Sequence, residues 1–201
     1  MEEPIVSPAP QSTPPKEAGT IAIARTIFEY VEMFVLALCA VLIVLTFLVR
    51  HSPVEGDSME PTLSEGDVLL MSGLGYTPER GDIIIAQSAS YGLARPLVKR
   101  VIAVGGDELD IDFDTWEVRV NGELIDEPYL LQGSGRMTRY YSTEHLTFPM
   151  TLPEGYLFVM GDNRQNSADS RHRSIGLIDQ RYVVGRVWSR VLPLERADIF
   201  S

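Results

Sequence analysis

One long apolar run near the N-terminus dominates the pattern of hydrophobic and polar positions. It extends over residues 27–49, and residues 33–49 contain no charged side chain. As an α-helix these 23 residues would be roughly 35 Å long, which exceeds the hydrocarbon core of about 30 Å in a bilayer. The run therefore predicts a single membrane-spanning helix, and we place the anchor at residues 25–50.

A cleaved signal peptide is the alternative interpretation of this run. The run is long for such a signal, a tail of 24 residues precedes it, and Arg50-His51 follows where a cleavage site would need small residues. We therefore favour an uncleaved anchor. Lys16 and Arg25 lie on the N-terminal side and only Arg50 on the other, so the positive-inside rule favours a cytoplasmic N-terminus.

The segment before the anchor, residues 1–24, differs sharply in composition. It contains five prolines among Ser, Thr, Gln and Ala residues. Such a segment cannot bury a hydrophobic core, so we expect a disordered cytoplasmic tail.

Beyond the anchor the apolar residues come in short runs that are typical of β-strands. Asn121-Gly122 lies between two of these runs and is the strongest short signal for a hairpin. Residues 131–150 are expected to form a variable loop or small insertion. We therefore expect residues 51–201 to form one extracytoplasmic domain of the mostly β class, an antiparallel and partly rolled sheet with little helix. The expected strands are 67–71, 82–86, 97–104, 115–120, 123–125, 156–160 and 182–188.

Charge and composition exclude several functions. The net charge of −11 argues against a nucleic-acid partner. The single cysteine, Cys39, lies in the apolar run, so the domain has no disulfide, and three histidines without zinc-ligand spacing predict no metal site. We expect no cofactor.

Lys99 is the first candidate for chemistry. Past residue 50 the chain has thirteen arginines and this one lysine. An arginine stays protonated, whereas a buried lysine can lose its proton and act as a base. On a strand over 97–104, Lys99 shares a face with Leu97, Val101 and Ala103, which predicts burial and a lowered pKa. A strand-edge lysine that reaches water is the alternative.

Ser58 is ambiguous in the same way. Asp57 and Glu60 around it are typical of the start of a helix, where a serine often has only a capping role. A serine hydroxyl becomes a nucleophile only when a nearby base accepts its proton. Neither Ser58 nor Lys99 is informative alone, and the hypothesis depends on the pair.

Four segments, taken together and in this order, resemble the conserved boxes of the bacterial type I signal peptidases, a family of serine–lysine peptidases. They cover much of the chain from residue 25 to 190. The segments are Gly56-x-Ser58-Met59-x-Pro61-Thr62-Leu63, Arg80-Gly81-Asp82-Ile83-Ile84-Ile85, Lys99-Arg100-Val101-Ile102-x-x-x-Gly106-Asp107, and Gly161-Asp162-Asn163-Arg164-x-Asn166-Ser167-Ala168-Asp169-Ser170-Arg171.

The resemblance implies a role for each matching residue. Ser58 would be the nucleophile and Lys99 the general base, with Ser167 orienting the amine. The Ser58 backbone N–H would bind the oxyanion, and Gly56 stands where some relatives add a hydroxyl donor. Ion pairs that fix the last segment would involve Asp162, Asp169, Arg171 and also Arg100.

The implied substrates are exported preproteins, cut after small residues at the first and third positions before the bond. Ser58 follows the anchor closely, which suits a substrate that emerges from the bilayer. An extended peptide would add to a sheet edge beside Lys99. The resemblance leaves contact with translocation machinery open. Candidate walls of the substrate pockets are Val54, Met59, Leu97 and Val98, for which ordinary core packing is the alternative.

Two other functions and one other catalytic pair are less consistent with the sequence. A self-cleaving regulatory relative would need a DNA-binding segment, and the short, irregular tail and the anchor argue against it. A membrane-anchored β module that binds peptides or assembles pili would have no need for Ser58 and Lys99 within matching segments. A Ser170–His172 pair lacks a third member and is too constrained locally to form a triad.

Overall fold

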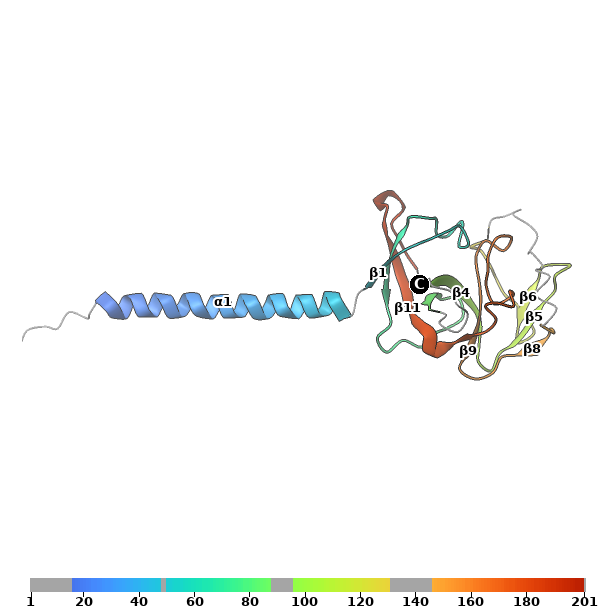
Figure 1. Cartoon of the computed structure of the whole chain (residues 1–201), viewed down its shortest axis with the longest axis horizontal. Coiled ribbons are helices and arrows are strands. Elements are labelled where there is room, and N and C mark those ends of the chain that lie inside the picture. The colour runs from blue at the N-terminus through green and yellow to red at the C-terminus, as the bar shows by residue number, and fades with distance from the viewer. Residues whose placement is uncertain (1–15, 48–49, 88–95, 131–145, 201) are drawn as a thin grey trace, which may run out of the picture. The chain divides into compact units, whose positions relative to one another are not determined.

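The computed structural model describes residues 16–47, 50–87, 96–130 and 146–200 of the 201-residue chain. The chain divides into two compact units, Met1–Leu45 and Thr46–Ser201. The first contains a single helix and the second contains all the described strands (Figure 1).

The helix α1 extends over Lys16–Phe47. Its stretch Ile23–Ile43 has a mean hydropathy of 2.1 and no buried residue, so it is long and apolar enough to cross a membrane. The helix begins at Lys16, whereas the sequence predicts a disordered tail up to residue 24. All five prolines of the tail lie before Lys16, and the residues that follow them are compatible with a helix. The rest of the tail lies outside the described residues.

The larger sheet organises the second unit. Its strands follow the order β1-β2-β11-β3-β4-β9-β10, every neighbouring pair is antiparallel, and β12 pairs with β11. The strands are β1 (Arg50–Pro53), β2 (Val68–Ser72), β3 (Ile83–Ala86), β4 (Leu97–Val104), β9 (Tyr156–Met160), β10 (Ile178–Asp179), β11 (Val183–Leu192) and β12 (Asp198–Ile199).

A smaller sheet has the order β7-β6-β5-β8. Figure 1 labels three of these strands, β6, β5 and β8. Its strands are β5 (Glu108–Ile111), β6 (Val118–Val120), β7 (Glu123–Leu124) and β8 (Met150–Thr151). The predicted hairpin joins β6 to β7, and Asn121 and Gly122 both have positive φ, of 54° and 81°, as a type I′ turn requires.

The mostly β, antiparallel class is confirmed, and several details differ. The apolar runs located β2, β3, β4, β6, β7, β9 and β11, but β1, β5, β8, β10 and β12 were missed. The missed strands have two to four residues, and β1, β10 and β12 also lack a run of apolar residues that would mark them. The helix expected after Asp57 is wrong, because residues 57–62 form turns. Two short 3₁₀ helices, η3 (Gln180–Tyr182) and η4 (Leu194–Arg196), flank β11. Residues 131–145 of the expected insertion lie outside the described residues.

Strand β4 lies between β3 and β9 and contributes to two clusters of the core. Val101 packs with residues of β3 and β9, whereas Ile102 and Ala103 both pack in the cluster shared with the smaller sheet. An irregularity in the pairing with β9 between Val101 and Ala103 breaks the expected alternation. Lys99, before this irregularity, is buried as predicted, with 4% exposure.

Candidate active site

The structure brings Ser58 and Lys99 together. Lys99 Nζ lies 2.6 Å from Ser58 Oγ and 2.9 Å from the Val98 carbonyl oxygen, to which it donates a hydrogen bond. Ile84 is directly opposite Lys99 in the neighbouring strand β3, so the amine projects from an apolar part of the sheet. A protonated amine donates to Oγ at this distance, and a neutral amine can accept the hydroxyl proton over the same contact.

Burial lowers the pKa of Lys99 from 10.5 to about 8. The carboxylates of Asp169 and Asp162 oppose this shift, and the Arg171 guanidinium adds to it. Loss of hydration disfavours the ammonium form, because a charged group is costly in a poorly solvated site. A tenth or so of the amine is then neutral at pH 7 and about half at pH 8, which is the range in which a general base works.

Ser58 lies in the turns between β1 and β2, and buried apolar residues hold those turns in place. Met59 and Leu63 are 1% and 0% exposed and pack in the core cluster that also contains Leu69. The Ser58 carbonyl accepts a hydrogen bond from the Asn163 backbone N–H at 3.0 Å. The backbone of Ser58 is therefore held by the core packing of Met59 and Leu63 and by the hydrogen bond from Asn163, while the Ser58 side chain remains half-buried.

Gly56, two positions before Ser58, has φ of 81°, a conformation that glycine adopts without strain. The Asp57 carboxylate accepts a hydrogen bond from Asn166 Nδ2 at 2.9 Å, and the Asp57 carbonyl accepts one from Asn163 Nδ2 at 3.2 Å. These contacts set the direction of the backbone at Ser58. Gly56 has no side chain that could donate a hydrogen bond to the oxyanion. The backbone N–H of Ser58 is therefore the candidate oxyanion donor in this turn.

A cleft of about 370 Å³ runs beside the two side chains. All four residues predicted as pocket walls line it, and Val54 and Met59 also belong to the core. Their contact with substrate stays a prediction. The lining residues are Ser52, Pro53, Val54, Glu55, Ser58, Met59, Pro96, Leu97, Val98, Lys99 and Ala168.

One edge of β4 is open along this cleft. Residues 97–100 pair with β3 on one side, whereas β9 joins the other side only from Arg100 onward. No strand within the described ranges covers the second edge of residues 97–99. Backbone groups at that edge can therefore pair with an added extended peptide.

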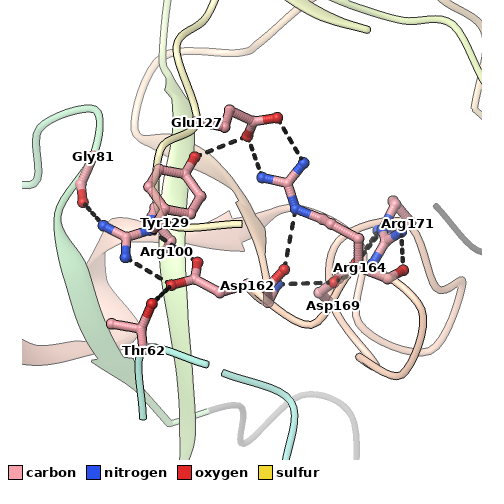
Figure 2. A network of polar contacts seen from close by, with 10 residues as sticks. Thr62, Gly81, Arg100, Glu127, Tyr129, Asp162, Arg164, Asp169 and Arg171 are labelled. Carbon is pink, nitrogen blue, oxygen red and sulfur yellow. Dashed lines mark hydrogen bonds and ion pairs between the residues drawn. The ribbon is translucent and has the colours of Figure 1, made fainter. Parts of the chain in front are cut away.

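Three ion pairs lie around the site, namely Arg100–Asp162, Arg171–Asp169 and Arg164–Glu127, and the first two involve residues of the matching segments alone (Figure 2). In the first, Arg100 Nε and Nη2 donate to the two oxygens of Asp162 at 2.9 and 2.7 Å, and Asp162 Oδ2 accepts the Thr62 hydroxyl at 2.5 Å. Arg100 Nη1 also donates to the Gly81 carbonyl at 2.8 Å. These contacts link the strand of the base to the turns of the nucleophile.

The second ion pair is the fully buried one between Asp169 and Arg171. Arg171 Nε and Nη2 donate to Asp169 at 2.8 and 2.7 Å, and neither side chain is exposed. Burial alone would raise the pKa of Asp169, but the bonds and charge of Arg171, the Gly161 N–H and the Ser167 hydroxyl together lower it. Asp169 therefore stays ionised close to Lys99.

Gly161 packs between Ser167 and the carbonyl of Ser58. Ser167 is buried, with 1% exposure, and its hydroxyl helps to stabilise the Asp169 carboxylate. A Cβ built on Gly161 would overlap both Ser167 Oγ and the Ser58 carbonyl oxygen, so only glycine fits. The orientation of the Lys99 amine by Ser167 stays a prediction.

Sequence reasoning missed several residues around the site. Thr62 lay within a matching segment but was given no role, and Glu127 and Tyr129 lay outside every such segment. The Ser170–His172 pair is not assembled: the fully buried Ser170 hydroxyl accepts the Val159 N–H, and His172 Nδ1 contacts Ser174 Oγ at 2.6 Å. Within the described residues no cluster of His, Cys, Asp or Glu side chains could hold a metal ion.

A hydroxyl in contact with a buried amine of lowered pKa, beside an apolar cleft with an open strand edge, defines a hydrolase of the serine–lysine type. The model of the family described as signal peptidase, peptidase S26, matches residues 27–192. The chain belongs to this family.

Two relatives and one solved structure illustrate the similarity. Signal peptidase I of Bacillus licheniformis is 37% identical over 165 residues, which cover 80% of this chain and 86% of the relative. Signal peptidase IB of Staphylococcus aureus (strain COL) is 33% identical over 183 residues, which cover 84% of this chain and 91% of the relative. The crystal structure of a signal peptidase I from Enterococcus faecalis V583 is 31% identical, covers 55% of this chain and 97% of its own, and superimposes with a TM-score of 0.44.

Proposed function

We propose that this protein is a membrane-anchored serine endopeptidase that removes signal peptides from exported preproteins, with Ser58 as nucleophile and Lys99 as general base. The contact of 2.6 Å between Lys99 Nζ and Ser58 Oγ carries this proposal. Membership of the signal peptidase family and the apolar stretch Ile23–Ile43 support the substrate class and the anchor.

The first half of the reaction acylates Ser58. The neutral Lys99 amine accepts the hydroxyl proton while Ser58 Oγ attacks the carbonyl carbon of the scissile peptide bond. The tetrahedral intermediate collapses, the C–N bond breaks, and Lys99 returns the proton to the leaving amine. The mature protein leaves with a free N-terminus, and the signal peptide remains as an ester on Ser58.

The second half releases the signal peptide. Lys99 removes a proton from a water molecule, whose oxygen attacks the ester carbonyl, and the proton returns to Ser58 Oγ as the ester bond breaks. The Ser58 N–H stabilises the negative oxygen in both tetrahedral states. Because Gly56 offers no side-chain donor, any second donor comes from elsewhere in the cleft or from water.

The cleft supports the proposed preference for small residues near the cut. An extended peptide added along residues 97–99 of β4 would direct alternate side chains toward Val54, Met59, Leu97 and Val98. These walls enclose apolar space near the dyad, which favours small apolar groups at the first and third positions before the bond.

The proposed domain limits keep the sequence prediction of an anchor at 25–50 and a catalytic domain at 51–201, although α1 extends over Lys16–Phe47 and Arg50 already belongs to β1. Two basic residues, Lys16 and Arg25, precede the apolar run and only Arg50 directly follows it. This difference supports a cytoplasmic N-terminus and an extracytoplasmic domain. The partners are then the bilayer and the signal peptide of the substrate, and a translocation complex that delivers preproteins is a further candidate. Protease accessibility of the domain in inverted and right-side-out vesicles tests this orientation.

The decisive experiment compares cleavage of a membrane-inserted preprotein by the wild type, Ser58→Ala and Lys99→Arg. Arginine keeps the positive charge and removes the base. We expect cleavage after a small residue by the wild type and none by either variant, with both variants folded by circular dichroism. Normal activity of Lys99→Arg would disprove the role of Lys99, and an inert wild type would disprove the proposed reaction.

A further inference from the structure

Tyr129 and Glu127 lie outside the matching segments and connect Arg100 with Arg164 in the polar network (Figure 2). They follow the β6–β7 hairpin of the smaller sheet. The Arg100 guanidinium carbon lies 3.9 Å from the centre of the Tyr129 ring, and Tyr129 Oη donates to Glu127 Oε1 at 2.8 Å. The carboxylate of Glu127 in turn binds both terminal nitrogens of Arg164.

One connection leads from Tyr129 to the base and the nucleophile together. Arg100 directly follows Lys99 in β4 and makes two hydrogen bonds with Asp162. Asp162 also accepts the hydroxyl of Thr62, which belongs to the turns that carry Ser58. The Tyr129 ring therefore covers the arginine that links these two parts of the site, and a cation over an aromatic face is attracted to it.

A second connection leads from Glu127 to the backbone behind Ser58. Arg164 is 5% exposed, and its Nε donates to the Gly161 carbonyl at 3.1 Å. Gly161 packs against the carbonyl of Ser58 without space for a side chain. Burial alone would lower the pKa of Arg164, but the Glu127 carboxylate raises it, so Arg164 stays charged.

We propose that Tyr129 and Glu127, in the segment that follows β7, are positioning residues for the Ser58–Lys99 pair, which hold Arg100 against Asp162 and Arg164 against Gly161. This inference rests on the proposed function of that pair. It assigns a role in catalysis to the segment that follows the smaller sheet's β6–β7 hairpin.

The charges around Lys99 predict the direction in which its pKa changes when this positioning is lost. The charged groups that act on Lys99 are Asp169 and Asp162, which favour the ammonium form, and Arg171, which disfavours it. Arg100 offsets part of the Asp162 charge through its two hydrogen bonds. If Arg100 loses the Tyr129 ring and moves away from Asp162, the carboxylate stabilises the Lys99 ammonium more strongly and the pKa of Lys99 rises.

The experiment uses the full chain in detergent micelles with three test variants and two controls. Tyr129→Leu removes the ring, Tyr129→Phe keeps the ring and removes the hydroxyl, and Glu127→Gln removes the charge. Tyr182→Leu changes an exposed tyrosine, and Glu117→Gln breaks the exposed ion pair of the smaller sheet between Glu117 and Arg119. Neither control touches the polar network in Figure 2.

Two readouts are measured for each protein. The first is kcat and KM for preprotein cleavage from pH 6 to pH 10. The second is the titration of Lys99 by NMR with labelled lysine in a Lys16→Arg background, where Lys99 is the only lysine of the chain. The titration reports the pKa of Lys99 whether or not the enzyme is active.

For Tyr129→Leu we expect the pKa of Lys99 to rise by about half a unit to one unit, and kcat near pH 7 to fall about three- to tenfold. Activity should recover near pH 10, and KM should change less than about twofold. Tyr129→Phe should stay close to the wild type in Lys99 pKa because it keeps the ring. Glu127→Gln should lower kcat by a similar factor, and both controls should match the wild type.

An unchanged Lys99 pKa in Tyr129→Leu, a loss of kcat in Tyr129→Leu that is equal at every pH, or a wild-type kcat in Glu127→Gln would overturn the inference and leave these residues a structural role only. If Tyr129→Leu does not fold, the kcat of Glu127→Gln still decides the matter, since a value equal to that of the wild type overturns the inference. Failure of the proposed function has a different signature, namely no cleavage by the wild type or normal cleavage by Ser58→Ala.

Discussion

Lys99 Nζ and Ser58 Oγ lie 2.6 Å apart, although the two residues are 41 positions apart in the chain. The contact joins a rigid central strand to a set of turns that buried side chains and the loop at residues 161–171 hold in place. Both reacting groups are therefore oriented before a substrate arrives, which avoids the entropy cost of bringing them together.

Cleavage should depend on pH through the ionisation of Lys99. Because only the neutral amine can accept the Ser58 proton, kcat/KM should rise with pH and level off above an apparent pKa near 8. The measurement is initial rates on a preprotein from pH 6 to pH 10, with folding checked at each pH. A rate that is flat over this range, or that falls between pH 7 and pH 9, would contradict this assignment.

Replacement of Lys99 by methionine should abolish cleavage but stabilise the domain near neutral pH. The pKa of Lys99 is about 8 in the folded state and 10.5 when solvated, so the unfolded chain binds the proton more tightly. Below pH 8 the buried Lys99 ammonium lowers the free energy of unfolding by its full amount, on the order of 3 kcal/mol. This penalty disappears above pH 10.5, where Lys99 is neutral in both states. The stability advantage of Lys99→Met should therefore narrow as pH rises from 8 toward 10.5.

Urea unfolding followed by tryptophan fluorescence measures this difference, because both tryptophans, Trp116 and Trp188, belong to the β unit. Lys99→Met also loses the hydrogen bonds of the amine to Ser58 and Val98. Its gain in unfolding free energy should therefore be smaller than the value expected from the pKa of Lys99 alone. A Lys99→Met protein that is less stable than the wild type at pH 7, or a difference that does not vary with pH, would contradict the prediction.

Gly161→Ala should inactivate the enzyme. Its Cβ would overlap Ser167 Oγ and the Ser58 carbonyl, so the turns of the nucleophile must move, and a shift of about 1 Å can reduce the rate about a hundredfold. Gly105→Ala is the matched control, since the atoms nearest to its Cβ would be backbone atoms of residues 153–155. We expect Gly105→Ala to lose stability while its folded fraction keeps normal kcat. Equal kcat for Gly161→Ala and the wild type would refute this role of Gly161.

Arg171→Met should destabilise the domain strongly. The change leaves the fully buried Asp169 carboxylate without its cationic partner, and breaking a buried pair in this way costs about 3–5 kcal/mol. The double variant Asp169→Leu with Arg171→Met should lose less than the sum of the two single changes, because no unpaired charge remains. Denaturant unfolding of the three variants checks the coupling, and additive losses would show that the pair contributes nothing as a pair.

Much of the architecture was readable from local patterns. The uncharged stretch 33–49 predicted a helix that could cross a membrane, and the Asn121-Gly122 turn predicted a hairpin that the structure contains. Lys99 was conspicuous because the domain otherwise uses arginine for positive charge, and its place between apolar residues predicted its burial. These signals are local, since the period of a strand or helix and the chemistry of a turn involve only neighbouring residues.

Only the tertiary structure decided which distant residues meet. Thr62 and Asp162 are 100 positions apart and Glu127 and Arg164 are 37 apart, and their contacts depend on the order and register of both sheets. The irregularity in β4 after Val101, which turns Ile102 and Ala103 toward the same cluster, likewise results from the pairing with β9. The sequence by itself determined the anchor, the β class and a lysine suited to be a base. The network that positions this lysine was decided by packing between elements far apart in the chain, for which no local pattern of residues exists.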